Sequence, residues 1–334
     1  MPGKQAEVSY SVIPPEALKS ELISKYGFDE SITCVLYRNG MNDIYQVTVG
    51  ETVYYLRIAF NRAYDITDYR EETAIMLALN ESGVKTAVPV KCNSGDYVWP
   101  LCVPEGTKYI TLFTEAKNQP SQDSAKINFN LGQAVAKIHT ISDEQSFNVS
   151  RSPIDFTELI HKPMQSLQPY LEKQCPEDYR LIASAMEDIE KYIAARLSTE
   201  KPCYGFCHGD IHLGNVFFSG DAPTFFDFDT MGYGWRAHDI SVNMFNMEMI
   251  NPQYRDGDDY NAFLDGYSSV RILSENELSC IDMFGAIRPI WALDINVRLL
   301  EMRNLSVHLN ECINIFIKVF KYWHNKYIIN RQER

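Results

Sequence analysis

Residues 207–239 read CHGDIHLGNVFFSGDAPTFFDFDTMGYGWRAHD, and this stretch decides the interpretation of the chain. His208, Asp210 and Asn215 stand in the order H-x-D-x-x-x-x-N, and Asp227 opens an Asp-Phe-Asp twelve residues after Asn215. A carboxylate can accept a proton, whereas an amide oxygen and a second carboxylate are hard ligands suited to Mg²⁺. The spacing therefore predicts a site in which Asp210 acts beside a cation held by Asn215 and Asp227.

The two motifs are separated by a predicted β-hairpin. Apolar residues at 216–218 and 224–226 flank a turn at 219–221 that contains Gly220. Such a hairpin would return Asp227 to the side of Asn215. Either motif alone could be an ordinary turn or an acidic strand end, but their order on one hairpin favours a functional site.

The motif H-G-D-x-H-x-x-N resembles the signature of the aminoglycoside phosphotransferase and choline kinase superfamily, which has a protein-kinase-like fold. It also has the spacing of the kinase catalytic loop, with Gly209 where protein kinases carry Arg. Gly234 and Asp239 also match the pattern of residues that follows the metal-binding Asp in this family. The helix L-G-x-x-x-A-x-x-H that precedes the signature in this family is matched by Leu131, Gly132, Ala136 and His139.

Composition bounds the alternatives. The 334 residues are 45% hydrophobic, which is typical of a soluble globular protein, and the formal net charge is −13 with a pI of about 5.0. This charge argues against nucleic acid or an anionic membrane as a partner and favours a cationic substrate. No signal peptide or membrane span is apparent, and the eight cysteines lack metal-ligand spacing. We expect a cytoplasmic monomer or homodimer.

The fold class expected is α+β with two lobes. Residues 1–115 are predicted to form a nucleotide-binding small lobe, which consists of a five-stranded antiparallel sheet with one main helix at 69–82. Segments 32–37, 44–49 and 53–59 are rich in β-branched and aromatic residues and predict three strands. Segments 88–90, 97–101 and 109–113 are predicted to complete the sheet. Residues 116–334 predict a mostly helical catalytic and substrate-binding lobe.

The family resemblance implies nucleotide-binding roles in the small lobe. The single-glycine turn at 37–43 would place Asn42 against phosphate, although an ordinary hairpin turn fits the residues as well. Arg57 stands where the family carries Lys, and either Glu72 or Glu71 would pair with it. Adjacent residues point about 100° apart around a helix, so only one of the two carboxylates is expected to face Arg57. Phe113 and Glu115 belong to the expected hinge beside the adenine.

In the second lobe the resemblance implies Asp210 as the catalytic base, with Asn215 and Asp227 as metal ligands. The supporting residues have less defined roles. His208 is expected to brace the loop, His212 to touch substrate or support Asp227, Asp229 to bind metal or substrate, Trp235 to line the substrate pocket in a loop at 232–236, and Asp239 to cap the next helix and tie down the catalytic loop.

The predicted activity is transfer of the γ-phosphate of ATP, or alternatively GTP, to a hydroxyl of a small molecule with Mg²⁺. An aminoglycoside, an amino alcohol or a hydroxy amino acid would be the acceptor. The acidic segment YRDGDDY at 254–260 suggests either a site for an aminated substrate or a solvated loop with a helix N-cap. The alternatives are a Ser/Thr protein kinase of the same superfamily and a non-catalytic kinase-like binding or structural protein.

Overall fold

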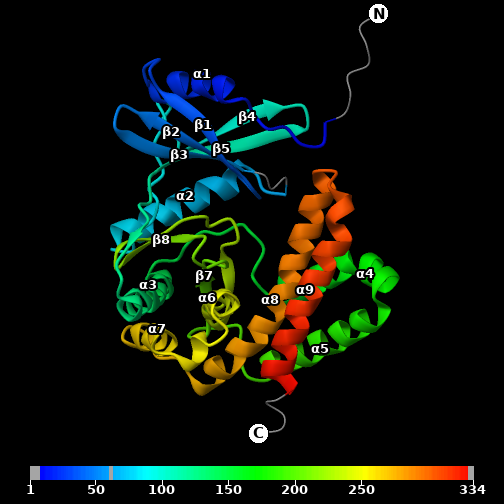
Figure 1. Cartoon of the computed structure of the whole chain (residues 1–334). Helices are drawn as coiled ribbons and strands as arrows, with labels where there is room; N and C mark the ends of the chain where they lie inside the picture. Colours follow the sequence, from blue (N-terminus) through cyan, green and yellow to red (C-terminus); the bar gives the residue numbers. More distant parts are fainter. Residues whose placement is uncertain (1–7, 60–62, 330–334) are drawn as a thin grey trace, which may run out of the picture. The chain divides into compact units, whose positions relative to one another are not determined.

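The computed structural model describes residues 8–59 and 63–329, and the chain divides into two compact units (Figure 1). One unit extends to Lys117 and also includes Asn148–Ser150. The other consists of Asn118–Phe147 and the chain from Arg151 onward.

The first unit is built on a five-stranded antiparallel sheet with the order β1-β2-β3-β5-β4. Its alternating burial, clearest in β2, places one face against a core and the other outward. This confirms the predicted α+β class and the sheet. The strands are β1 (Thr33–Asn39), β2 (Asp43–Val49), β3 (Thr52–Ile58), β4 (Val98–Val103) and β5 (Gly106–Thr114).

Two helices complete this unit. α1 (Pro15–Tyr26) ends at Gly27, whose φ of +71° suits a residue without a side chain, and it buries Leu18 and Leu22 in the core of the sheet. α2 (Ile66–Glu81) begins with a reciprocal capping box between Asp65 and Asp68. The candidate strand at 88–90 forms only an isolated bridge from Pro89 to Phe113, since proline cannot donate to a ladder.

The second unit is mostly helical, as the sequence predicts. Its long helices α8 and α9 pack side by side, and α6 packs on α8 (Figure 1). The helices are α3 (Ser124–Glu144), α4 (Lys162–Gln174), α5 (Pro176–Ala194), α6 (Arg236–Ile250), α7 (Asp258–Ser268), α8 (Glu275–Met302) and α9 (Leu309–Trp323). Short segments of other helix types are the π-helices η1 (Thr157–His161) and η4 (His324–Ile329) and the 3-10 helices η2 (Tyr254–Asp256) and η3 (Ser306–His308).

Short strands interrupt these helices. β7 (Tyr204–Cys207) pairs with β10 (Gly232–Trp235), and β8 (Val216–Gly220) forms the predicted hairpin with β9 (Ala222–Phe225). β6 (Gln119–Pro120) adds to β8 in parallel. The expected loop at 232–236 is therefore wrong, because its first four residues form a strand.

Helix α3 crosses α7 closely, and this contact explains the glycine of its L-G-x-x-x-A-x-x-H motif. A Cβ on Gly132 would lie 2.0 Å from the carbonyl oxygen of Phe263, and one on Gly266 would lie 1.9 Å from that of Phe129. Only hydrogen fits at these two positions. The close crossing positions His139, at the far end of the motif, inside the unit.

Across residues 8–59 and 63–329, every helix is too short or too polar to span a lipid bilayer.

Candidate active site

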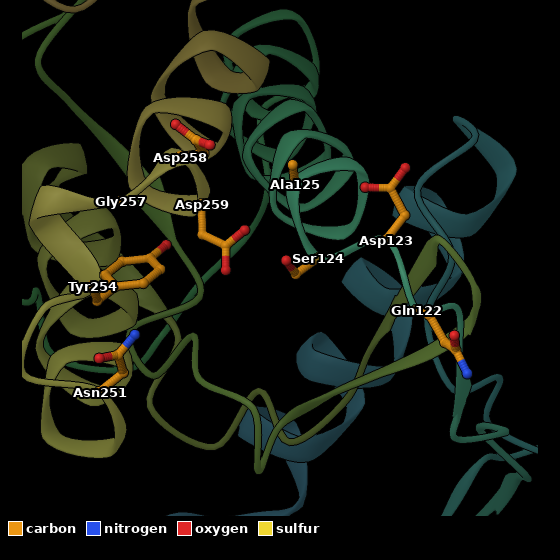
Figure 2. A pocket seen from close by; sticks show the side chains of 9 residues that line it. All are labelled: Gln122, Asp123, Ser124, Ala125, Asn251, Tyr254, Gly257, Asp258 and Asp259. Carbon is orange, nitrogen blue, oxygen red and sulfur yellow. The ribbon is translucent and has the colours of Figure 1, made fainter.

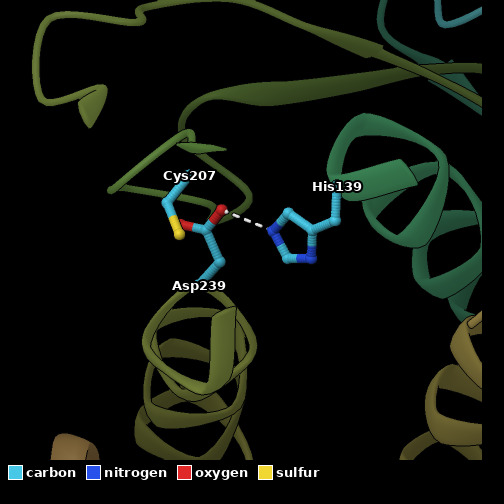
Figure 3. Close-up of side chains that lie close together, drawn as sticks. All are labelled: His139, Cys207 and Asp239. Atoms are coloured by element: carbon cyan, nitrogen blue, oxygen red, sulfur yellow. Dashed lines mark hydrogen bonds and ion pairs between the residues drawn. The ribbon is translucent and has the colours of Figure 1, made fainter. Parts of the chain in front are cut away.

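The loop that follows β7 is held in place by a buried carboxylate. Asp239 accepts hydrogen bonds from the backbone N–H of His208 at 2.8 Å and of Gly209 at 2.7 Å. Nε2 of His139 lies 3.1 Å from the same carboxylate (Figure 3). Asp239 is fully buried, and although burial raises the pKa of a carboxyl group, the interaction with His139 outweighs this effect and keeps the pKa of Asp239 below the usual value.

The expected helix-capping role of Asp239 is wrong, although the carboxylate does tie down the loop. Helix α6 begins at Arg236, so Asp239 lies inside its first turn, and Trp235 occupies the N-cap position. A carboxylate in the first turn still interacts favourably with the helix dipole. The side chain, however, is directed to the loop before β8.

His139, Cys207 and Asp239 have ligand atoms within 4.8 Å of one another, but their bonding disfavours a metal (Figure 3). Since Asp239 can only accept, Nε2 of His139 carries the proton, and Nδ1 then accepts from the hydroxyl of Tyr267 at 2.9 Å. Burial raises the pKa of the Cys207 thiol well above its ordinary value, so the sulfur stays protonated. The cluster is a structural hydrogen-bond network.

His208 and Gly209 shape the loop itself. The ring of His208 is fully buried; Nδ1 accepts from the backbone N–H of Asp210 at 3.3 Å, and Nε2 lies 3.2 Å from the carbonyl oxygen of Phe226. Burial lowers the pKa of His208, which favours the neutral ring that these two bonds require. Gly209 has a φ of +86°, and a Cβ there would lie 2.2 Å from the carbonyl oxygen of Thr230.

Asp210, the carboxylate of this loop, contacts three side chains. One oxygen, Oδ2, accepts from Nδ2 of Asn215 at 3.0 Å and lies 3.3 Å from Nε2 of His212, and the other, Oδ1, accepts from the guanidinium of Arg288. Burial alone would raise the pKa of Asp210, but Arg288 and then His212 hold it far below its ordinary value. Asp210 is therefore ionised at neutral pH, as a group that receives a proton must be.

The hairpin returns the Asp-Phe-Asp segment to the loop that follows β7. The backbone N–H of Phe226 donates to the carbonyl oxygen of Asn215 at 3.0 Å, and Asp227 is the next residue. Asp227 has a φ of +61°, a conformation that aspartate adopts more readily than most residues. Such backbone strain is concentrated at functional sites. The amide oxygen of Asn215 and the carboxylate of Asp227 form a donor set of hard oxygens, which fits a divalent cation.

The remaining predicted residues have different surroundings. His212 donates toward Asp210, with its Nδ1 accepting from the N–H of Gly214 at 2.9 Å. Asp229 is half-buried in the turn after Phe228. Trp235 is 2% exposed, and its indole N–H donates to the carbonyl oxygen of Ser198 at 3.0 Å, so this ring is part of the core. The expectation that Trp235 belongs to a substrate loop is wrong for this reason.

In the first unit, Arg57 on β3 forms a two-point ion pair with Glu72 on α2. Nη1 lies 2.7 Å from Oε1, and Nη2 lies 2.9 Å from Oε2. Both side chains are buried, at 5% and 0% exposure, which excludes a solvent-facing arginine. Glu71 instead accepts from the side chain of Asn148 at 2.5 Å and from the backbone N–H of Ser150 at 2.6 Å.

The expected phosphate turn and hinge lie at the ends of strands in the same unit. Asn42 is buried between β1 and β2, and its carbonyl oxygen accepts from the N–H of Gly40 at 3.2 Å. Phe113 lies near the end of β5, with the guanidinium carbon of Arg57 5.2 Å from its ring centre. Glu115 is exposed immediately after that strand.

Comparison with known proteins agrees with this geometry. The model of the phosphotransferase enzyme family matches residues 37–273, which include the Arg57 pair, the catalytic loop and the hairpin. The chain belongs to this family. A protein of Synechocystis sp. described as uncharacterized is 28% identical over 305 residues, covering 89% of this chain and 82% of its own.

Two solved structures show the same protein-kinase-like fold. An amicoumacin kinase in complex with AMP-PNP, Ca²⁺ and Ami superposes with a TM-score of 0.74 at 20% identity, covering 92% of this chain and 93% of its own. A microcompartment-associated aminopropanol kinase superposes with a TM-score of 0.73 at 18% identity, covering 92% and 95%. These likenesses confirm the predicted fold class.

Sequence reasoning missed two arginines in this member of the phosphotransferase family. Arg151 donates to the carbonyl oxygen of Phe228 at 2.6 Å, which fixes the centre of the Asp-Phe-Asp segment. Arg288 on α8 binds Asp210 across 78 residues of sequence. It is the single basic residue between Cys280 and Val297, an otherwise largely apolar run. A lone arginine in such a run is a signal for a buried partner.

The acidic segment at 254–260 lines a separate hollow of about 380 Å³ (Figure 2). Asp258 and Asp259 lie in the first turn of α7, Asp123 caps α3, and Tyr254 closes one side. Acidic residues in these positions complement the positive ends of the two helix dipoles. The side chains therefore have a structural explanation, and the residues lining this hollow do not include the catalytic loop.

Proposed function

We propose that the chain transfers the γ-phosphate of ATP to a hydroxyl of a small molecule, with Asp210 receiving the hydroxyl proton. The observation that carries the proposal is the link between Asp210 and Asn215. The amide of Asn215 donates to both the side chain and the backbone oxygen of Asp210 at 3.0 Å, while the β8–β9 hairpin brings Asp227 alongside. A base and two oxygen ligands thus form one connected structure.

Each residue has a part in this proposal. Asp210 orients the acceptor hydroxyl and takes its proton as the new bond to phosphorus forms. Asn215 and Asp227 hold the cation, for which Mg²⁺ is the expected species. When bound, that ion neutralises charge on the phosphates and positions them for transfer. Most of the rate would come from this positioning, since phosphoryl transfer demands little covalent chemistry from the protein.

In the first unit we propose that Arg57, fixed by Glu72, binds the phosphates of the nucleotide. Arginine keeps the positive charge and can grip phosphate at two points. Asn42 would contact phosphate from the β1–β2 turn, and the backbone near Phe113 and Glu115 would meet the adenine. The first unit would then be the nucleotide-binding domain and the second the catalytic and acceptor-binding domain.

The acceptor would be a small molecule that carries a hydroxyl and an amine. An amicoumacin kinase and an aminopropanol kinase share the fold, and the first is solved with AMP-PNP and Ca²⁺, which supports a nucleotide and a divalent cation here. No Ala-Pro-Glu sequence follows Asp227, which disfavours a protein substrate. All eight cysteines, each within the described residues, are free thiols, which supports a reducing compartment such as the cytoplasm.

The test is ADP release with Mg²⁺ and ATP across aminoglycosides, amino alcohols, hydroxy amino acids and a generic protein substrate. The proposal predicts release that depends on a small-molecule acceptor and disappears in Asp210→Ala. Phosphorylation of the protein substrate alone would support the protein-kinase alternative. The absence of both turnover and nucleotide binding would support a non-catalytic kinase-like protein.

A further inference from the structure

Within the part of the chain that the structure describes, only one of the two terminal nitrogens of the Arg288 guanidinium has a hydrogen-bond partner. Nη2 bonds to Asp210, but Nη1 is buried and has no hydrogen-bond partner among residues 8–59 and 63–329. The side chain is only 10% exposed, and the ring of Trp291 lies 4.3 Å from the guanidinium carbon. Stacking on the indole fixes the plane of the guanidinium, so its position is set before any ligand arrives.

A second polar atom without a partner lies in the same electrostatic environment. His238 on α6 is 4% exposed, and its Nδ1 is buried without a hydrogen bond to any described residue. Burial first, and then the nearby charge of Arg288, lower the pKa of His238 to about 4, against the opposing effect of Asp239 and Asp210. The ring is therefore neutral at physiological pH and offers one donor and one acceptor.

Buried donors without partners are rare, and a charged one is the more unfavourable. The unpaired nitrogen of Arg288 is positively charged and planar, a geometry that matches a carboxylate. Because Nη1 and Nη2 belong to one guanidinium, hydrogen-bond lengths place a group bound at Nη1 on the order of 4–6 Å from a hydroxyl on Asp210. Within a small molecule, that separation is typical of a hydroxyl two to four carbons from a carboxylate.

We propose that Arg288 binds a carboxylate of the acceptor, so that the substrate is a hydroxy amino acid. The neutral ring of His238, whose Nδ1 is unpartnered among the described residues, offers a second hydrogen bond to the same acceptor. This proposal rests on the kinase activity proposed above and narrows its acceptor. A buried arginine next to the base disfavours a polycationic acceptor such as an aminoglycoside, because like charges repel.

The test uses acceptor pairs that differ only by the carboxylate. Serine is compared with ethanolamine, threonine with aminopropanol, and glycerate with ethylene glycol. For each pair, kcat/KM is measured by ADP release, and binding is measured calorimetrically with ADP and Mg²⁺ present. In the wild type we expect the carboxylate member to be preferred in at least one pair in both measurements. A preference for the decarboxylated member, or none, in every pair would overturn the proposal.

Substitutions of Arg288 distinguish its proposed binding of the acceptor carboxylate from its effect on Asp210. Arg288→Gln removes a charged hydrogen bond to the acceptor, and we expect the preference for the carboxylate member to fall about 10- to 100-fold. Any effect through Asp210 lowers kcat for both members alike and leaves their ratio unchanged. Arg288→Lys keeps the charge but loses the planar fork, so it should lose part of the preference, and it serves as the test if Arg288→Gln does not fold.

The matched control is Arg298→Gln. Arg298 lies on the same helix, is 63% exposed and pairs with Asp294 at 2.9 Å, so its loss should leave the preference unchanged. An unchanged preference in a folded Arg288 variant would contradict the proposal. If no acceptor is phosphorylated but binding still shows the Arg288-dependent preference, the kinase proposal fails and the carboxylate site stands.

Discussion

Arg57 pairs with Glu72 and not with its neighbour Glu71, although both glutamates are buried in the same turn of α2. The helix rotates adjacent residues by about 100°, which directs Glu72 to β3 and leaves Glu71 for Asn148 and Ser150. The two carboxylates are alike in chemistry and burial and differ in partner. They form a natural matched pair for testing the nucleotide-binding role proposed for Arg57.

Glu72→Gln should weaken both stability and ATP binding. It removes the buried carboxylate that pairs with the guanidinium of Arg57, and breaking a buried ion pair in this way destabilises folded proteins by about 3–5 kcal/mol. Misplacement of Arg57 should also raise the Kd for ATP. Glu71→Gln keeps an acceptor oxygen for only one of its two partners, Asn148 or Ser150, but it leaves the pair of Arg57 with Glu72 intact and should affect ATP binding far less. Chemical unfolding and calorimetric ATP titration of both variants test this, and equal effects on ATP affinity would contradict the assignment.

Asp210→Asn should strongly reduce phosphoryl transfer but leave nucleotide binding nearly unchanged. The amide is nearly isosteric but cannot receive the hydroxyl proton, so kcat should fall by about 10²–10⁴-fold. Because the proposed ATP contacts come from Arg57 and the cation ligands, the Kd for ATP should change little. Single-turnover kinetics with parallel nucleotide titration measure both quantities. A variant with full turnover would show that Asp210 is not the base.

Asp227→Asn should weaken binding of the nucleotide with its cation. Asparagine tolerates the φ of +61° found at this position, so the backbone should be retained while a charged ligand is lost. We expect the dependence of ATP affinity on Mg²⁺ concentration to shift to higher Mg²⁺ by about tenfold or more. Asp221→Asn is the control and should show no shift, because Asp221 is a half-buried turn residue that pairs with Lys126.

Ionisation of Asp143 should make the free energy of unfolding of the second unit depend on pH in the acidic range. Its carboxylate accepts from Arg236 at 2.7 Å and from Arg271 at 2.8 Å, and although burial opposes ionisation, these arginines lower its pKa from 3.8 to about 2. A lowered pKa in the folded state stabilises the protein above pH 3.8, and this contribution is lost as pH falls toward about 2.

Asp143→Asn should therefore reduce the free energy of unfolding at pH 7 by about 1.5–3 kcal/mol, the range for a charged hydrogen bond. The wild type and the variant should converge in stability as the pH falls. Urea unfolding followed by circular dichroism between neutral and acidic pH measures the difference. A gap that stays constant over this range would show that ionisation of Asp143 is not its source.

The parts of the molecule that follow from local sequence were predictable. The hairpin between Asn215 and Asp227 and the strand carrying Arg57 depend on short-range alternation and turn residues. Trp235 was misjudged because flanking glycines suggested a loop, whereas pairing with β7 makes it a strand residue of the core. Pairing between distant segments is decided by tertiary contacts that no local pattern contains.

Arg288 illustrates the same limit at the site itself. A lone arginine in a largely apolar run indicates a buried partner, but nothing near residue 288 in the sequence identifies that partner as Asp210. The contact exists because α8 packs in the same unit as the loop after β7. The residues proposed here to carry the general chemistry stand at a spacing that the sequence shows directly. The residue proposed here to select the acceptor was not, because substrate specificity depends on side chains brought together by the fold.

The most direct test of the central claim follows the phosphate itself. ATP labelled in its γ-phosphate is incubated with Mg²⁺ and the preferred hydroxyl acceptor, and the products are separated and identified by mass spectrometry for wild type and Asp210→Asn. The account predicts label on the acceptor hydroxyl with the wild type and about 10²–10⁴-fold less with the variant. Label found only in inorganic phosphate, or equal transfer by both proteins, would contradict it.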